Sequence, residues 1–388
     1  MQADFHYYAA YCAACLAGWS HEESLLIAWS DQFTDCCSRT FLTGIHAPRA
    51  AATTQTQTEL MDARTDFLGL QEITRIWASF HFLPGDLYAD PPRKTSRRYR
   101  NKYRLICGPN GSLAGDTVQL AKDRGLPAAG LAMHILSDTW AHRFFAGTPS
   151  LVINNTSSHF YELLPGETGE TKRRIRFRHN PGGKDDPEQG IYTGTLYQAS
   201  ENAVMNLGHG RAGHLPDYSF IRYCYLPAWG EYGEMTKDNP SDYYHAFCQM
   251  IHALKYLRGS VDIFETGTYD APADETLQER ILAILTRRQT DASADWKALG
   301  ESLSGRPVED FDPDRFTDAY RQADAADKDA TILGQYILAA LAQKSMVTAK
   351  IAQSGNPLAG TSVTWDGKKL PGIRDYLKLV ELAERSGT

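Results

Sequence analysis

The chain has 388 residues, of which 42% are hydrophobic and 22% are charged. These values are typical of a globular protein with a sizeable core, and they exclude a wholly disordered chain. The net charge of -7 gives no overall attraction to nucleic acid or to an anionic membrane, so any phosphate-binding surface must be a local patch. No stretch approaches the roughly 20 apolar residues of a membrane helix, and the residues after Met1 lack a signal-peptide pattern. We therefore expect a cytoplasmic protein, or one exported without a cleavable signal.

The seven cysteines do not form a disulfide or zinc-ribbon pattern. Cys12 and Cys15 make a single CxxC within an apolar, helical stretch, whereas a zinc ribbon needs two such pairs. We expect reduced and mostly buried thiols.

The first 80 residues predict three helices, over 5–17, 20–37 and 59–80. Gly18 ends the first, and Pro84-Gly85 follows the third. The second begins at a capping box, in which Ser20 and Glu23 satisfy each other's backbone amides. The Ala/Thr/Gln-rich segment 46–57 reads as a loop between helices.

The middle of the chain contains a basic stretch, a long helix and an insertion. Residues 91–112 are basic and interrupted by Pro and Gly. Pro127 suits the first turn of a helix, which is expected to run to Gly147. Residues 148–195 are rich in turn residues and include the alternating run KRRIRFR, so they predict a small β-hairpin-like insertion.

Further helices are expected after this insertion, over 196–207, 241–258, 275–290, 329–352 and 371–385. The polar, Asp-rich segment 291–328 reads as a surface excursion. The sequence therefore predicts a mainly α protein. We expect a helical metal-binding domain over 1–260, carrying the insertion at about 148–195, and a C-terminal helical extension over 261–388 packed on it.

A candidate metal site lies on the helix that begins at Pro127. His134, Asp138 and His142 are spaced i, i+4, i+8, so they project from one side of a helix that is otherwise apolar. A lone histidine is more often a satisfied structural residue than a ligand. Three ionisable groups on one stripe of a core helix are costly without a partner, and a metal ion is the simplest partner. A carboxylate between two imidazoles can bridge two metal ions.

Other candidates surround this helix. His81 lies between two phenylalanines where the chain turns. Asp31 and Asp35 are one turn apart on the second helix, and a solvated face is the alternative for both. Two further histidines, His209 and His214, lie on the Gly-rich turn GHGRAGHLPD, where glycines let the backbone bend tightly.

On these residues, the sequence resembles the superfamily of zinc-dependent phospholipases C and three-zinc single-strand nucleases. The resemblance covers roughly residues 1–217. It is the distant resemblance expected of an uncharacterised bacterial branch of the superfamily. His134-x3-Asp138, followed by His142, is the closest correspondence, and the family's equivalent aspartate bridges two zinc ions. His81 looks like the ligand after the family's third helix. The resemblance implies a multi-helix phospholipase C/nuclease-like bundle with extra C-terminal helices.

The resemblance implies further ligands and shows three departures. Asp35, or less so Asp31, matches the earlier aspartate, and His6 matches the histidine of the N-terminal helix. The family usually has five residues between its bridging aspartate and the next histidine, whereas this chain has three. The family's last pair, His-x3-Glu or His-x3-Asp, is replaced by the looser set His209, His214 and Asp217. Many members also use a mature N-terminal amino group, for which Met1 or Asp4 would have to substitute here.

This resemblance implies two or three bound zinc ions, with other divalent metals as alternatives, and a metal-dependent phosphodiester hydrolase of the phospholipase C type. Asp31 or Asp35 is the candidate catalytic residue that orients the attacking water. One alternative is a single-strand nuclease of the same superfamily. Another is a non-catalytic, metal-stabilised interaction protein whose partner the sequence does not identify.

Two basic patches are candidate substrate-binding surfaces. The first contains Arg97 and Arg98, with tyrosines interleaved. The second contains Arg174 and Arg176, which alternation places on one face of a strand. Both suit a phosphate-rich substrate, and we expect phospholipid in preference to single-stranded nucleic acid. The alternative for both is a solvated loop that offsets the acidic remainder.

Overall fold

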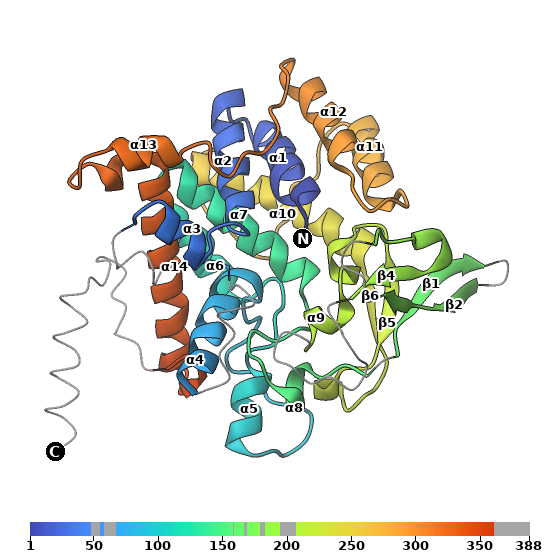
Figure 1. The fold of residues 1–388 in the computed structure, drawn as a ribbon. Coiled ribbons are helices and arrows are strands. Elements are labelled where there is room, and N and C mark those ends of the chain that lie inside the picture. The colour runs from blue at the N-terminus through green and yellow to red at the C-terminus, as the bar shows by residue number, and fades with distance from the viewer. Residues whose placement is uncertain are drawn as a thin grey trace, which may run out of the picture.

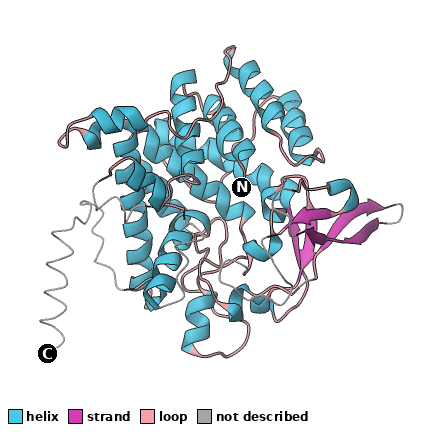
Figure 2. Ribbon diagram, in the orientation of Figure 1, coloured by secondary structure: helices cyan, strands magenta, loops and turns pink. Residues whose placement is uncertain are grey.

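The computed structural model describes residues 1–47, 55–57, 67–157, 159–166, 169–178, 183–194 and 207–360. Helices dominate this part of the chain, and a small sheet lies at one side of them (Figure 1; Figure 2). The expectation of a mainly α fold is confirmed. Among the described residues, no helix combines the length and the apolar composition needed to cross a bilayer.

The α-helices and two π-helical segments follow one another along the chain. They are η1 (Asp4–Ala9), α1 (Ala10–Leu16), α2 (His21–Phe33), α3 (Arg39–Gly44), α4 (Phe67–Ile76), η4 (Trp77–His81), α5 (Arg97–Tyr103), α6 (Ser112–Ala121), α7 (Leu126–Ala141), α8 (Leu151–Asn154), α9 (His209–Ala212), α10 (Asn239–Arg258), α11 (Glu275–Thr286), α12 (Ser293–Ser304), α13 (Thr317–Gln322) and α14 (Ile332–Gln353), with η1 and η4 in π geometry.

The helix α7 lies at the centre of the molecule. It packs against α2, α6, α10 and α14, and every residue from Pro127 to Ala141 is buried. The expected extension of this helix to Gly147 is wrong, because the helix ends at Ala141. The following backbone pairs with another segment instead: Cys107 N donates to Phe145 O at 2.7 Å, and Gly147 N donates to Leu105 O at 2.9 Å.

The N-terminal helices follow the sequence pattern closely. The capping box is present, since Ser20 N donates to Glu23 Oε2 at 2.9 Å and Glu23 N donates to Ser20 Oγ at 3.4 Å. The helix it starts ends at Phe33, four residues before the expected end. The predicted third helix is observed over 67–81, and its earlier part lies outside the described residues.

The sheet is larger than the predicted insertion. The predicted hairpin is formed by β1 (Tyr161–Gly166) and β2 (Gly169–Arg174), and β1 also pairs with β5 (Arg222–Tyr225), which pairs with β6 (Met235–Asp238). All pairs in this β2-β1-β5-β6 sheet are antiparallel. The strands β5 and β6 have four residues each, too few for alternation to reveal them in the sequence.

A second pair of strands carries the predicted basic alternation. The strand β3 (Arg176–Arg178) runs parallel to β4 (Ile191–Thr193). Arg174 and Arg176 are exposed, whereas Ile175 between them is buried, as the alternation predicts. The predicted single strand is wrong, however, because Arg174 ends β2 and Arg176 begins β3, and these strands belong to different sheets.

The C-terminal helices belong to the main hydrophobic cluster, which runs from Met1 to Ala359. The helices predicted over 241–258, 275–290 and 329–352 are confirmed as α10, α11 and α14. The expected surface excursion over 291–328 is wrong, because α12 and α13 form there and bury Trp296 and Tyr320. These two helices were not predicted because the segment is mostly polar, which hid the helical spacing of its few apolar residues. The helices predicted over 196–207 and 371–385 lie almost entirely outside the described residues.

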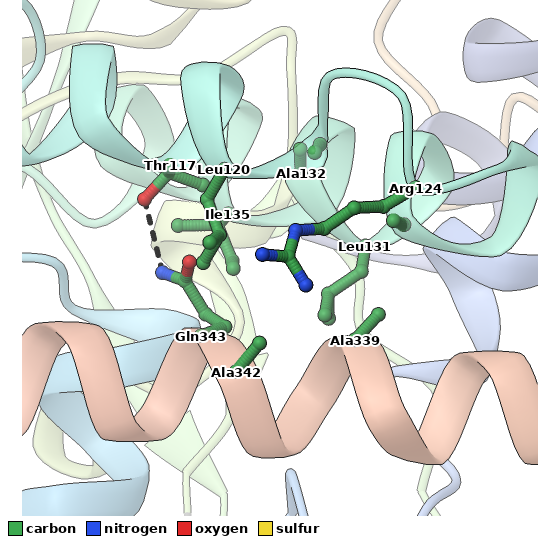
Figure 3. Close-up of a pocket in the computed structure, with 11 residues that line it drawn as sticks. Thr117, Leu120, Arg124, Leu131, Ala132, Ile135, Ala339, Ala342 and Gln343 are labelled. Atoms are coloured by element: carbon green, nitrogen blue, oxygen red, sulfur yellow. Dashed lines mark hydrogen bonds between the residues drawn. The ribbon is translucent and has the colours of Figure 1, made fainter. Parts of the chain in front are cut away.

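All seven cysteines are free thiols, and Cys12, Cys37, Cys107, Cys224 and Cys248 among them are buried. A small pocket lies between α6, α7 and α14 (Figure 3). Its lining is mostly Ala, Leu and Ile, with the Arg124 guanidinium pointing into it and a hydrogen bond of 2.9 Å from Gln343 Nε2 to Thr117 Oγ1. None of its lining residues is a candidate metal ligand, so it is a gap in helix packing away from the site below.

Candidate metal centre

Buried carboxylates and imidazoles from six separate segments meet beside the N-terminal end of the chain, which lies next to α7 (Figure 1). Because several of these side chains could hold a metal ion, we call this group of candidate ligands the metal centre. It consists of the Met1 amino group, His6, Asp31, Asp35, His81, His134, Asp138, His142, His209 and Asp217. The two π-helical segments each supply one member, His6 and His81, and π geometry is frequent at functional sites.

One set of donors lies on the Oδ2 side of Asp138. His81 Nδ1 and His134 Nε2 are each 3.3 Å from this oxygen and 3.3 Å from each other. The Asp35 Oδ1 atom is 3.8 Å from both imidazole nitrogens. Thr56 O lies 2.9 Å from His81 Nε2 and fixes the orientation of that ring. Asp35, His81 and His134 therefore have donor atoms close enough to share one ion, and Asp138 Oδ2 lies against both imidazole nitrogens.

A second set of donors lies on the Oδ1 side of the same carboxylate. The Met1 amino nitrogen is 3.1 Å from Asp138 Oδ1, and His6 Nε2 is 3.3 Å from it. The two oxygens of Asp138 thus face different sets of nitrogen donors, which is the arrangement a bridging carboxylate needs.

Asp31 lies behind two of these imidazoles. Its Oδ1 is 2.7 Å from His6 Nδ1 and 3.3 Å from His134 Nδ1, and the two rings stack with centroids 3.9 Å apart. These donors are also close enough to share an ion. The 2.7 Å contact to His6 has the length of a charge-assisted hydrogen bond, so we assign Asp31 to positioning: it binds His6 Nδ1 and lies beside His134 Nδ1, while both Nε2 atoms face Asp138.

The third set lies next to the Met1 amino group. Asp217 Oδ1 is 3.1 Å from His209 Nε2 and 3.6 Å from His142 Nε2, and the His142 Nδ1 is held by the His81 carbonyl at 2.7 Å. His142 is the C-cap of α7 and no longer helical, so three intervening residues suffice to carry its ring to this set. His209 is on α9, and Asp217 ends the short helix η7 (Leu215–Asp217).

Asp217 is a member of the third set that the sequence did not predict as a ligand; the sequence pattern favoured His214. The structure places His214 at the rim, 51% exposed, with its Nδ1 3.2 Å from Asp217 Oδ2. Asp217 is only 8% exposed and faces the other donors. The sequence did contain a signal for Asp217, since it is an acidic residue on the same Gly-rich turn as His209. The similar family has His-x3-Asp here, whereas His209 and Asp217 are separated by seven residues.

The charges of the centre require positive compensation. Burial raises the pKa of the Asp138 carboxyl, but His142, the Met1 amino group and His134 hold it well below its ordinary value. Burial lowers the pKa of His134, yet the Asp138 and Asp35 carboxylates raise it to about 10. A protonated imidazole therefore supplies the countercharge that a metal cation supplies when bound.

Two other members, His142 and Asp217, have the protonation states that metal ligands need. Burial lowers the pKa of His142 to about 4, which leaves its imidazole neutral near neutral pH. Burial raises the pKa of Asp217, but His209 and the Met1 amino group keep it well below its ordinary value, so this carboxylate is ionised. Neutral imidazoles and ionised carboxylates are the forms that bind divalent metals.

An unsatisfied buried atom supports the fit of a cation. His6 Nε2, a donor of the second set, is buried without a hydrogen-bond partner of good geometry among the described residues. Such atoms are rare in folded proteins unless a water or an ion completes them. The donors are imidazole and carboxylate, a set that suits zinc.

The predicted substrate-binding arginines lie away from the centre. Arg97 and Arg98 are on α5, and Arg97 donates to the Gly355 carbonyl at 3.5 Å. Arg174 and Arg176 are on β2 and β3 at the sheet, and Arg176 donates to the Gln189 carbonyl at 3.3 Å. None of these contacts touches a member of the metal centre.

A family profile matches residues 1–351, and its description is "family of unknown function (DUF6765)". The match covers most of the chain, so the chain belongs to this family. No curated protein and no solved structure matches the chain.

Proposed function

We propose that this member of the DUF6765 family is a metal-dependent phosphodiester hydrolase of the phospholipase C type, with zinc as its metal. The observation that carries the proposal is the position of Asp138, whose two carboxylate oxygens each face a separate set of donors. Asp217 Oδ1, which belongs to the third set, lies 3.4 Å from the Met1 amino nitrogen, and that nitrogen also contacts Asp138 Oδ1. Several cations within one cleft are typical of enzymes that hydrolyse phosphate esters.

The three sets assign the residues that would hold the ions. Those for the first ion are Asp35, His81, His134 and Asp138 through Oδ2. Those for the second are His6 and Asp138 through Oδ1. Those for the third are His142, His209 and Asp217.

Bound zinc ions would lower the pKa of water toward neutrality and neutralise the oxygens of a phosphate. The side chains of the centre would position the ions and the substrate. Asp35 and His209 are 26% and 22% exposed, so they form the solvent-facing edge at which a substrate phosphate would enter. Asp138 and His134 are buried beneath them and fix the distances between the sets.

The burial of the two candidate catalytic aspartates, Asp31 and Asp35, favours Asp35 over Asp31. Asp31 is fully buried behind His6 and His134, where a substrate or its attacking water would have no access. Asp35 is at the open edge, 3.8 Å from His81 and from His134. We therefore propose Asp35 as the aspartate that contacts the reacting groups and Asp31 as a positioning residue.

The test uses the zinc-loaded full chain and bis(p-nitrophenyl) phosphate, a phosphodiester that needs no membrane. The Asp138→Asn variant should lose bound zinc and hydrolyse the phosphodiester at the background rate. The substitution removes the negative charge of the one carboxylate that the first and second donor sets share. Asp242→Asn is the matched control: Asp242 is also buried and paired, with Lys237 at 2.6 Å, but it is not a member of the metal centre. Unchanged hydrolysis in Asp138→Asn would remove the bridging role.

A second comparison decides the substrate class. Release of a phosphorylated headgroup from phosphatidylcholine should exceed cleavage of single-stranded DNA by the same zinc-loaded chain. The reverse ranking would identify a nuclease. Zinc bound at full occupancy with neither activity would instead support the non-catalytic, metal-stabilised interaction protein.

A further inference from the structure

Apolar side chains gather on one exposed part of the surface. The described residues include six large hydrophobic side chains that are exposed, and four of them lie on three neighbouring segments. These four are Tyr88, Leu151, Val152 and Tyr232, with exposed fractions of 67%, 45%, 50% and 47%. A concentration of exposed apolar groups on one face marks an interaction surface.

Direct contacts join these segments into one surface. The helix α8 contacts both α5 and the short helix η8 (Ala228–Gly230), and α5 lies beside α8 in Figure 1. Asn155 Nδ2, one residue after α8, donates to Tyr232 Oη at 3.0 Å. Arg104, one residue after α5, donates to the Tyr88 and Ala89 carbonyls at 3.4 and 3.0 Å. We call this surface the α5–α8 face.

The same face carries uncompensated positive charge. Residues 91–104 contain seven Lys and Arg residues and no acidic residue. Three of the seven are paired, since Arg93 contacts Glu231, and Arg100 and Arg104 share Asp90. The other four have no ion pair with any described acidic side chain: Lys94, Arg97, Arg98 and Lys102. A chain with a net charge of -7 thus presents a cationic patch beside exposed apolar side chains.

We propose that the α5–α8 face docks on an anionic phospholipid bilayer. Lys and Arg residues are attracted to the negative surface of such a bilayer, and aliphatic and aromatic side chains partition into its interface. The exposed Leu151 and Val152 favour a bilayer over a nucleic acid, because a phosphate backbone offers them nothing to bury against.

The docking face adjoins the metal centre. Asn154, the last residue of α8, accepts a backbone hydrogen bond of 2.6 Å from Gly208, which immediately precedes His209. The Asn154 side chain also binds Ala146 on the segment that leaves His142, at 2.7 and 2.8 Å. Two donors of the third set are therefore anchored to the helix that carries Leu151 and Val152. A docked bilayer would bring headgroup phosphodiesters to the rim of the metal centre. This role in substrate delivery rests on the proposed function, whereas docking itself does not.

The experiment is co-sedimentation of the full chain with vesicles in the presence of a chelator, so that hydrolysis plays no part. Vesicles of phosphatidylcholine mixed with phosphatidylglycerol should bind the chain, and binding should weaken as salt rises. The double variant Arg97→Gln/Arg98→Gln should bind about 25-fold more weakly, since each basic residue near the surface contributes about five-fold. The variant Leu151→Ser/Val152→Ser should also bind more weakly.

Matched controls change exposed residues elsewhere. Ile263→Ser/Leu282→Ser removes two exposed apolar side chains, and Arg306→Gln/Arg321→Gln removes two exposed arginines, all outside the face. Both should bind as the unchanged chain does. The proposal is overturned if anionic and neutral vesicles bind equally, if neither binds, or if Arg97→Gln/Arg98→Gln loses only binding to single-stranded DNA.

The two proposals fail separately. Vesicle binding without hydrolysis of bis(p-nitrophenyl) phosphate would retain the docking face and reject the hydrolase. Hydrolysis of that compound without vesicle binding would retain the hydrolase and reject the docking face.

Discussion

At the scale of single residues, the metal centre depends on which nitrogen of each imidazole faces inward. Asp31 contacts the Nδ1 atoms of both His6 and His134, so it fixes two rings that contribute to different donor sets. Carboxylates in this position orient histidine ligands and increase their basicity. One residue behind the ligands therefore couples the first set of donors to the second.

Replacing Asp31 tests this role. Asp31→Asn should lower zinc affinity by about 10–100-fold while leaving the fold intact, because asparagine keeps the shape and loses the charge. Competition with a zinc chelator measures the affinity, and circular dichroism checks the fold. Asp242→Asn, which removes another buried carboxylate, should leave zinc affinity unchanged. Affinity that is equal in the Asp31→Asn variant and the unchanged chain would contradict the positioning role.

The residues of the centre were predictable to different degrees. His134 and Asp138 are one turn apart on α7, so helical geometry alone placed them together, whereas His142 lies just after the end of α7. His6 and His81 are on other segments: the local context of His81 made it a candidate ligand, and the resemblance to a known family assigned both histidines to the same site as the central helix. The spacing of Asp31 and Asp35 shows a shared helix face but not which imidazoles either residue meets, since that is decided by tertiary packing.

At the scale of secondary-structure elements, the close packing of α2 against α7 sets the distance between Asp31 and Asp138. Gly130 on α7 makes this approach possible. A Cβ atom at Gly130 would lie 2.5 Å from Ser30 Cβ and 2.9 Å from Asp31 N, and it would also overlap the Ile27 carbonyl. Such distances do not occur between real Cβ atoms and their neighbours, so a side chain at this position must move one helix.

Gly130→Ala should therefore lower both stability and zinc affinity. Overpacking of a buried contact costs about 1–3 kcal/mol of the free energy of unfolding, and the displaced α2 carries Asp31, and Asp35 in the turn that follows the helix, away from α7. Gly115→Ala is the matched control on α6, where the new methyl would only meet Thr266 Cγ2 at 3.4 Å. That control should gain up to about 1 kcal/mol from helix propensity. Urea unfolding measures both, and equal stability of the two variants would contradict this account of the helix contact.

Elements with long, regular patterns were predictable, and short ones were not. The helices α7, α10 and α14 have enough turns for their apolar spacing to stand out. The strands β5 and β6 and the helix α13 have four to six residues, and their formation depends on partners distant in sequence. The end of α7 was also misplaced, because backbone pairing between 105–107 and 145–147 competes with further helix.

At the scale of the whole molecule, the C-terminal helices complete the core that holds the centre. Trp296 on α12 contacts Phe5 at 6.1 Å between ring centroids, one residue from His6. Tyr336 on α14 donates to Thr34 Oγ1 at 3.0 Å, one residue from Asp35. Side chains beyond residue 260 thus pack directly behind two members of the metal centre, so the predicted extension and the predicted metal-binding domain share one hydrophobic cluster.

A chain that ends at residue 260 should therefore not fold cooperatively. It would expose Phe5, Thr34 and the surface of α7 that α14 covers. Thermal unfolding followed by circular dichroism should show a broad change without a midpoint, whereas the full chain should show one sharp transition. A sharp transition in the shortened chain would contradict the shared core and favour an independent domain over 1–260.

The most direct test of the account is the number of zinc ions bound by the full chain, measured by elemental mass spectrometry after zinc loading and dialysis. The arrangement of donors predicts two or three ions per chain, and Asp138→Asn should lose those that the bridging carboxylate holds. An unchanged chain that binds none, or a single ion that persists in Asp138→Asn, would contradict the account.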